Sequence, residues 1–245
     1  LPHSPEFMED RVLSDAYPID RLREILVPCE TWHPYPTRDE RADWEAIPES
    51  VRQAHVAKGE ACLSFAWEPF RATLFLEMSR TGDRALYDKH RARHRTALCD
   101  LVVAECVEGQ GRFMDDIVDG VWALCEESFW GKPFTLSTQK AGRDLPDTSE
   151  PIVALFVAEA ASLLAWTCYL LRPQIEGYSR LILPRVNREM QRRMLVPCLE
   201  RNDFWWMGFR SGDGVSPPRL NNWNPLINSG WLTAALLMEG DPERR

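Results

Sequence analysis

The sequence, 245 residues long, predicts an all-α protein built from antiparallel helical hairpins. Three observations support this prediction. Apolar residues recur at spacings of three and four almost throughout the chain from Ser50 onward. No convincing stretch shows the apolar–polar alternation of a half-buried strand. The segments between the helical patterns are mostly short, and short connections favour antiparallel neighbours.

Each helix has its own signals. The segment over residues 84–107 carries an apolar stripe from Leu98 to Cys106 and ends at glycines that tolerate a left-handed stop. The segment over 151–171 is apolar on nearly all sides, which predicts a position inside a helical layer. The last helix is expected to begin with Asn224 as its cap and Pro225 at its first position. In chain order, the predicted helices cover residues 51–58, 68–78, 84–107, 116–128, 151–171, 175–183, 185–200 with a kink at Pro197, and 225–238.

Composition excludes several classes of protein. Apolar residues make up 44% of the chain and charged residues 27%, which argues against a disordered chain. No apolar run is long enough for a transmembrane helix, so no membrane association is expected. The net charge of −8 disfavours a sequence-independent nucleic-acid binder. Seven cysteines without a C-x-x-C pair indicate reduced thiols rather than a zinc ribbon or a disulfide framework.

We expect one helical domain over residues 8–245. Residues 1–7, LPHSPEF, resemble the remainder of an expression linker, with Met8 as the native start. No signal-peptide pattern follows Met8, so the expected location is cytoplasmic. Residues 185–219 carry more Arg than acidic residues although the whole chain is acidic. This stretch could face an anionic partner, but a solvated helix face is the simpler interpretation.

One acidic motif suggests metal chemistry. Asp115, Asp116 and Asp119 match DDxxD, which on a helix places carboxylates on one face for a magnesium–diphosphate site, as in an isoprenoid enzyme. The partner motif is missing, and acidic residues at a helix N-terminus also complement the helix dipole. His90 and His94 share a helix face within HRARHR, but no acid or Cys ligand is near, so we expect a solvated surface. No metal and no cofactor are predicted.

Tryptophan and asparagine are concentrated near the C-terminus. Trp205 and Trp206 precede a loop, and Asn221, Asn222 and Trp223 follow it. Aromatic faces stack on the C–H faces of sugars, and amides bridge hydroxyls and carboxylates. The alternative is that the amides shape the chain while the indoles fill the core.

Four ordered strings resemble the heparinase II/III-like polysaccharide lyase family: ATLFLEMSRTGDR, GRFMDDIVDGVWALCEESFWG, PCLERNDFWWMGF and NNWNPLINSGWLTAALLME. The resemblance extends from about Trp44 to Glu239. It implies an incomplete (α/α) toroid followed by a β-sandwich domain. It also implies β-elimination on an acidic polysaccharide or oligosaccharide that contains uronic acid.

The resemblance assigns roles to individual residues. Asn222 is the match to the amide that neutralises the uronate carboxylate, with Asn221 as the alternative. Trp223 stands where many members have His. The resemblance further implies that the cleft is lined by Glu126, Glu127, Trp130, Trp205 and Trp206. Trp223 and Arg210 are two further candidates for substrate contacts. Because Glu126 and Glu127 are adjacent on a predicted helix, they point about 100° apart, and at most one is expected to face the cleft.

The proton-transferring groups of the family are not expected within this chain. They are a Tyr in a string after the last helix and a His in the β-sandwich, and none of the five Tyr here stands in that context. We therefore expect little or no lyase activity from these 245 residues alone. A carbohydrate-binding helical module without chemistry is the alternative function.

Overall fold

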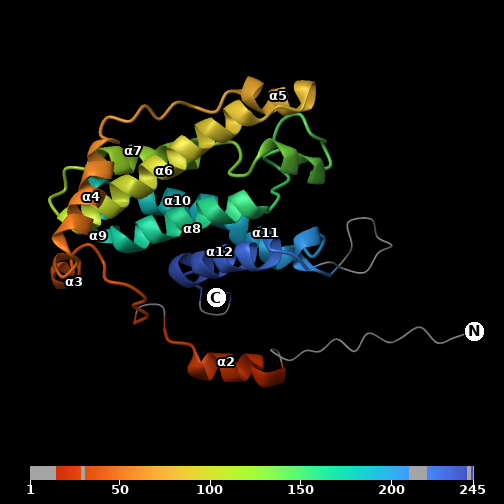
Figure 1. Ribbon diagram of the computed structural model, residues 1–245. Coiled ribbons are helices and arrows are strands. Elements are labelled where there is room, and N and C mark those ends of the chain that lie inside the picture. Colours follow the sequence, from red (N-terminus) through yellow and green to blue (C-terminus); the bar gives the residue numbers. More distant parts are fainter. Residues whose placement is uncertain (1–14, 29–30, 210–219, 242–243, 245) are drawn as a thin grey trace, which may run out of the picture. The chain divides into compact units, whose positions relative to one another are not determined.

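The computed structural model describes residues 15–28, 31–209, 220–241 and 244. All regular elements in these ranges are helical, which confirms the all-α prediction (Figure 1). The chain divides into two units, Leu1–Pro34 and Tyr35–Arg245, so the larger unit begins later than the predicted domain. The smaller unit contains α2 (Ile19–Ile25), none of whose residues is buried.

The larger unit contains the remaining helices. In chain order they are α3 (Arg41–Glu45), α4 (Glu49–Glu60), α5 (Ala72–Thr81), α6 (Ala85–Glu108), α7 (Met114–Glu126), the 3₁₀ turn η1 (Pro133–Thr138), α8 (Leu155–Leu170), α9 (Arg172–Tyr178), α10 (Ile182–Met190), the π turn η2 (Gln191–Leu195), α11 (Val196–Glu200), the 3₁₀ turn η3 (Trp205–Met207) and α12 (Trp223–Met238).

Helices α6 and α7 form an antiparallel hairpin. The turn between them begins at Gly109, which ends α6 with φ of 74°. Further along, Leu98 of α6 lies beside Gly120 of α7, and Arg95 meets Glu127 just beyond the end of α7. This pairing agrees with the expectation that a short connection gives antiparallel neighbours.

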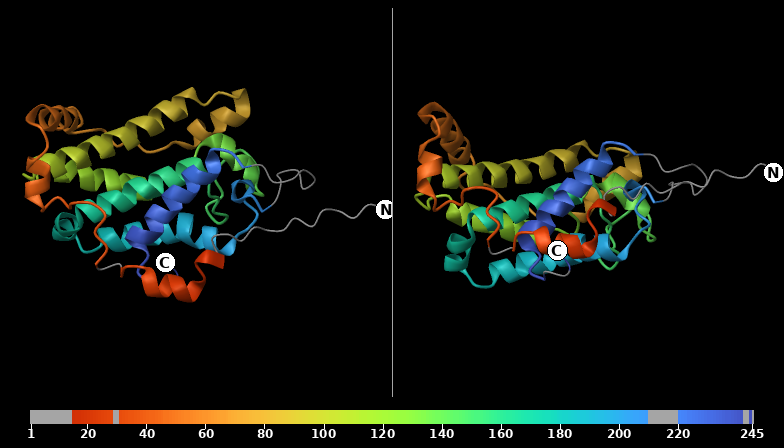
Figure 2. Two further views of the ribbon diagram at one scale, coloured as in Figure 1. Left: turned by 60° about the horizontal axis from the view of Figure 1, so that its bottom comes forward. Right: turned by 90° about the horizontal axis from the view of Figure 1, so that it is seen from below.

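The two most extensive helix contacts each place a glycine against an alanine. Helix α4 packs on α6, where Gly59 faces Ala104, and α8 packs on α12, where Gly230 faces Ala158 (Figure 2). A Cβ on Gly230 would lie 2.7 Å from the main-chain oxygen of Ala158. The absence of a side chain therefore allows these helices to approach closely.

Several helices begin later or break elsewhere than the sequence predicts. Residues 61–71 form no helix beyond a turn, and α5 begins at Ala72 rather than at residue 68. We call residues 61–71 the strap. The predicted break between Leu183 and Arg185 lies instead at Ser179, whose backbone is extended, and Pro184 stands in the first turn of α10, which tolerates a missing N–H. At Pro197, where a kink is predicted, the helix continues as α11 directly after the π turn η2. Helix α12 begins at Trp223, two residues before the predicted start.

Helix α6 buries charged as well as apolar side chains. Arg95 donates to both carboxylate oxygens of Glu127 at 2.5 and 2.6 Å. Glu105 accepts hydrogen bonds from Arg38 Nε at 3.0 Å and from the main-chain N–H of Gly111 at 2.8 Å. Since an unpaired buried charge is costly, these contacts fix the segments around α6.

The cysteines in the described ranges are free thiols. Four of the cysteines, Cys106, Cys125, Cys168 and Cys198, are buried as free thiols, and burial raises the pKa of each to about 12. Within the described ranges, no single helix combines the length and apolar character needed to cross a bilayer; α8 and α9 reach them only as a pair bent by 86°.

We predict that Gly230→Ala destabilises the larger unit by about 1–3 kcal/mol, because the new methyl group meets the backbone of α8, which cannot move aside like a flexible side chain. Chemical denaturation measures the free energy of unfolding. The matched control is Gly177→Ala on α9, where a Cβ meets nothing within 4 Å. That variant should be unchanged or stabilised by about 0.5–1 kcal/mol. Equal effects of the two substitutions would contradict the close approach of α8 and α12.

Candidate functional site

The start of α12 presents an aromatic and amide surface. Trp223 lies 5.1 Å from Trp205, centroid to centroid, and 6.2 Å from Phe134. All three rings are partly exposed, and Asn221 and Asn222 are exposed beside Trp223. We call these five residues the α12 platform. It joins η1, η3 and α12, which are far apart in the sequence.

The two adjacent asparagines of the platform differ in their hydrogen bonds. The Asn221 Oδ1 accepts from the main-chain N–H of Trp223 at 2.8 Å, so this side chain shapes the turn into the helix. Asn222 occupies the N-cap position but makes no side-chain cap, and its amide bonds to no other described residue. Of the two candidates, only Asn222 therefore has a side-chain amide that is not bonded within the described part of the chain.

Asn224 does not cap the helix as predicted. It lies inside α12 and is buried, its Oδ1 accepting from the main-chain N–H of Asn221 at 2.7 Å and its Nδ2 donating to the main-chain oxygen of Trp206. It thus holds η3 against the start of α12. The prediction was wrong because it assigned the first helical position to Pro225.

Two of the tryptophans expected to contact substrate lie in the core. Trp130 and Trp206 are each 1% exposed. Their indole N–H groups donate to main-chain oxygens, Trp130 to Leu124 and Trp206 to Val153, both at 2.8 Å. Buried and satisfied, they offer no surface to a sugar, and the alternative that the indoles fill the core applies to them. Arg210 lies outside the described residues.

A pocket of about 500 Å³ lies between the strap, α6 and α7. We call it the strap pocket. Its walls are aromatic rings and carboxylates, with Trp67 of the strap lying over Gly120 of α7. The residues that line it are Phe65, Trp67, Glu68, Pro69, Phe70, His94, Asp119, Trp122, Ala123, Glu126, Glu127 and Ser128.

Both Glu126 and Glu127 line the strap pocket, which corrects the expectation that at most one faces a cleft. The expectation assumed that both residues lie on one helix. Helix α7 ends at Glu126, and Glu127 has extended backbone angles, so the 100° separation of adjacent helical residues does not apply. Their surroundings still differ, because Glu127 is buried against Arg95 whereas Glu126 is exposed and accepts from Arg185 at 3.0 Å.

His94 is buried, not solvated as predicted from the charged HRARHR run. It is 2% exposed and packs edge-on against Phe65, Trp67 and Phe70, with ring centroids 5.4 to 5.6 Å away. Neither of its ring nitrogens has a hydrogen-bond partner among the described residues, and the same holds for the indole N–H of Trp67. Burial, then the nearby charges of His90, Arg95 and Arg93, lowers the pKa of His94 to about 4.

The strap pocket suits a ligand with an apolar face and hydroxyl groups. Trp122 is 45% exposed and lines the pocket, with the guanidinium carbon of Arg185 lying 5.3 Å from the centroid of its ring. The carboxylates of Asp119 and Glu126 are hydrogen-bond acceptors, while the ring nitrogens of His94 and the indole N–H of Trp67 have no partner among the described residues. Buried polar atoms without partners call for an explanation, and ligand hydroxyls would satisfy them. His94 was missed from the sequence because its charged neighbours suggested exposure.

The acidic motif has a structural role. Asp115 and Asp116 lie in the first turn of α7, as the dipole interpretation predicts, and Asp115 accepts from the hydroxyl of Tyr178 at 2.8 Å. Asp119 instead lines the strap pocket. Across the described ranges, no three His, Cys, Asp or Glu side chains are grouped to hold a metal ion.

Comparison with known proteins finds no family model that matches the chain and no curated protein that matches it. The resemblance to the lyase family therefore rests on the four sequence strings alone.

We predict that the buried, neutral His94 makes stability depend on pH. Because its pKa is lowered from about 6.5 to about 4, the unfolded chain takes up the proton first, and stability is lost as the pH falls through this window. His90, Arg93 and Arg95 on α6 oppose the positive charge. Asp119, Glu126 and Glu127 line the same pocket from α7 and its end but make no hydrogen bond to the ring.

His94→Phe keeps an aromatic ring and removes this titration. Between pH 6.5 and 4, the wild type should lose roughly 1–3 kcal/mol more stability than the variant, measured by chemical denaturation. His55→Phe, at a partly exposed position on α4, is the control and should follow the wild type. Parallel pH profiles of the wild type and His94→Phe would refute the prediction.

Proposed function

We propose that the chain is the helical, substrate-binding part of a polysaccharide lyase that acts on uronic-acid-containing chains and resembles the heparinase II/III-like family. The observation that carries the proposal is the exposed amide of Asn222 at the start of α12, which has no partner among the described residues and lies beside the Trp205–Trp223 pair. The layered helices are compatible with the incomplete (α/α) toroid that the resemblance implies. We propose that the helices of the larger unit form part of such a toroid.

The chemistry explains why an amide is needed at this place. A lyase must neutralise the uronate carboxylate before the C5 proton becomes acidic enough to remove. An Asn amide donates a hydrogen bond to the developing charge without itself being ionised. The N-terminus of α12 adds the positive end of a helix dipole, which favours a carboxylate.

The base and the acid are proposed to come from the β-sandwich domain that the resemblance implies. Three tyrosines of the larger unit already donate their hydroxyl hydrogens, Tyr87 to Gly131 O, Tyr169 to Tyr35 O and Tyr178 to Asp115 Oδ1. Tyr87 is also buried, and its pKa is raised by that burial. These contacts support a substrate-holding rather than a proton-transferring role for this chain.

We predict that Asn222→Ala weakens the binding of a uronate oligosaccharide by about tenfold or more, the value of one hydrogen bond to a charged group. Heparin, heparan sulfate and alginate oligosaccharides are the probes, and tryptophan fluorescence reports binding. Stability should not change, because the amide has no partner among the described residues. Asn221→Ala differs by removing the acceptor of the Trp223 N–H, so it should lower the melting temperature.

The matched control is Asn228→Ala, an exposed asparagine further along α12 that should bind like the wild type. If Asn222→Ala and Asn228→Ala both retain full affinity for every uronate probe that binds the wild type, Asn222 has no role in substrate recognition. No binding of any uronate probe to the wild type would remove the proposal altogether.

A carbohydrate-binding module without chemistry is the second candidate. The strap pocket favours it, because aromatic walls and carboxylates there suit sugar hydroxyls. The ultraviolet absorbance of unsaturated uronate ends separates the candidates when it is measured on the longest available form of the protein. Turnover supports the lyase, whereas binding of neutral sugars without turnover supports the module.

A further inference from the structure

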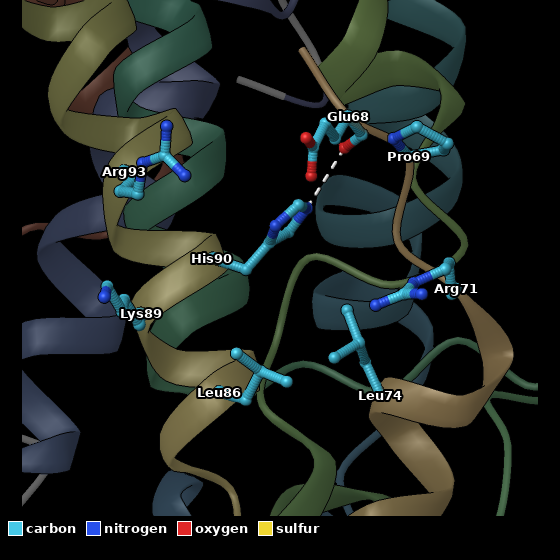
Figure 3. Close-up of a pocket in the computed structure, with 8 residues that line it drawn as sticks. All are labelled: Glu68, Pro69, Arg71, Leu74, Leu86, Lys89, His90 and Arg93. Atoms are coloured by element: carbon cyan, nitrogen blue, oxygen red, sulfur yellow. Dashed lines mark hydrogen bonds between the residues drawn. The ribbon is translucent and has the colours of Figure 1, made fainter. Parts of the chain in front are cut away.

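A second cavity, of about 470 Å³, lies between the strap, α5 and the first half of α6. Figure 3 shows Leu86 and His90 of α6 facing Arg71 and Leu74 across it. The strap pocket shares its residues Glu68 and Pro69 with this cavity. The full lining is Glu68, Pro69, Arg71, Leu74, Leu86, Lys89, His90 and Arg93.

The cations of α6 fall into two sets. Arg91 and Arg95 are buried and pair with carboxylates, Arg91 with Glu159 at 3.2 Å and Arg95 with Glu127 at 2.5 Å. Lys89 and Arg93 are exposed, line the cavity, and form no ion pair within the described part of the chain. Cations on the same helix are thus neutralised on its inner face and left uncompensated at the cavity.

Arg71 brings a third uncompensated cation from the other side. It stands just before α5, has no carboxylate partner among the described residues, and extends into the cavity (Figure 3). The opposite wall is held in place by His90, whose Nε2 lies 3.0 Å from the main-chain oxygen of Glu68. The carbonyl can only accept, so His90 donates this hydrogen bond and ties the strap to α6.

The balance of charge favours an anion. Arg71, Lys89 and Arg93 face one carboxylate, that of Glu68, in a protein whose net charge is −8. A cleft lined by one sign of charge focuses the field and concentrates ligands of the opposite sign. Arginine forks match the oxygens of phosphate and sulfate, and a Lys at the rim adds a point charge.

The apolar part of the lining further restricts the kinds of ligand that the cavity can bind. Pro69, Leu74 and Leu86 form apolar walls, and the cavity is larger than a single oxyanion requires. We propose that this cavity binds a small molecule that carries a phosphate or sulfate group on a partly apolar body. The oxyanion binds at Arg71, while Arg93 and Lys89 add positive charge around it, and the body rests against Leu86. The lyase proposal is separate, because the α12 platform takes no part in this cavity.

Titration calorimetry at low ionic strength tests the cavity with four probes: inorganic phosphate, inorganic sulfate, phenyl phosphate and phenyl sulfate. We expect at least one phenyl ester to bind, more tightly than its inorganic ion, with affinity falling as salt rises. Arg71→Gln and Arg93→Gln should each weaken that ester about fivefold or more. Glu68→Gln should strengthen it, since the one opposing charge is removed. The phosphate and sulfate arms identify which group the cavity prefers.

Two controls separate a built cavity from loose surface charge. Arg80→Gln, at an exposed position on α5 outside the cavity, should bind like the wild type. Leu86→Ala should reduce the advantage of the phenyl ester and leave inorganic-anion binding unchanged, because Leu86 is 59% exposed and can be replaced without unfolding. The proposal is overturned if no probe binds, or if Arg80→Gln weakens binding as much as Arg71→Gln and Arg93→Gln do.

Discussion

The burial of charge on α6 is the constraint on which the larger unit depends. This helix lies inside the fold and yet carries Arg91, Arg95 and Glu105 among its buried residues. Each buried charge requires a partner, and the partners come from separate parts of the chain. Arg38 precedes α3, Glu127 follows α7, and Glu159 belongs to α8. Pairing these charges therefore fixes how three other segments meet α6, in addition to the apolar contacts.

The candidate sites on α6 contain polar side chains that have no partner among the described residues. His94 is buried on the same helix with neither ring nitrogen bonded to a described residue. Lys89 and Arg93 line the neighbouring cavity without a carboxylate partner in the described ranges. Helix α6 therefore organises the fold and also carries the polar side chains that are available to the proposed ligands. The α12 platform shows the same pattern. The side chains of Asn221 and Asn224 form hydrogen bonds with the backbone, whereas that of Asn222 has no partner among the described residues.

The helices could be predicted from the sequence where apolar spacing was long and regular. The predicted helix over residues 84–107 became α6 (Ala85–Glu108), an agreement within one residue at each end. The strap could not be predicted from the sequence. Its residues 68–71 form no helix and instead contact α6, through the Glu68 carbonyl and the Phe70 ring, and no local sequence pattern indicates such contacts. Pro184 misplaced one predicted break, since a proline in a first turn and one that ends a helix look alike in sequence.

Side-chain roles were harder to predict than helices. Trp206 and Trp205 are neighbours in the sequence, yet one is 1% exposed and the other is part of the α12 platform. Composition identifies both tryptophans as candidates for a sugar contact, and only their packing in the folded protein shows which of them is accessible. Likewise, the run of charges around His94 suggested solvent exposure, whereas half of that run is buried, and its Arg91 and Arg95 pair with carboxylates that are distant in the sequence.

The strap has a thermodynamic consequence. Because Glu68 and Pro69 form part of the wall of two cavities, a ligand that shifts them in one cavity changes the shape of the other. Free energy is a function of state, so the effect of the first ligand on the affinity for the second must equal the reverse effect. The strap, which has no regular helix and is held to α6 through His90, would thereby couple the two binding equilibria proposed for these cavities.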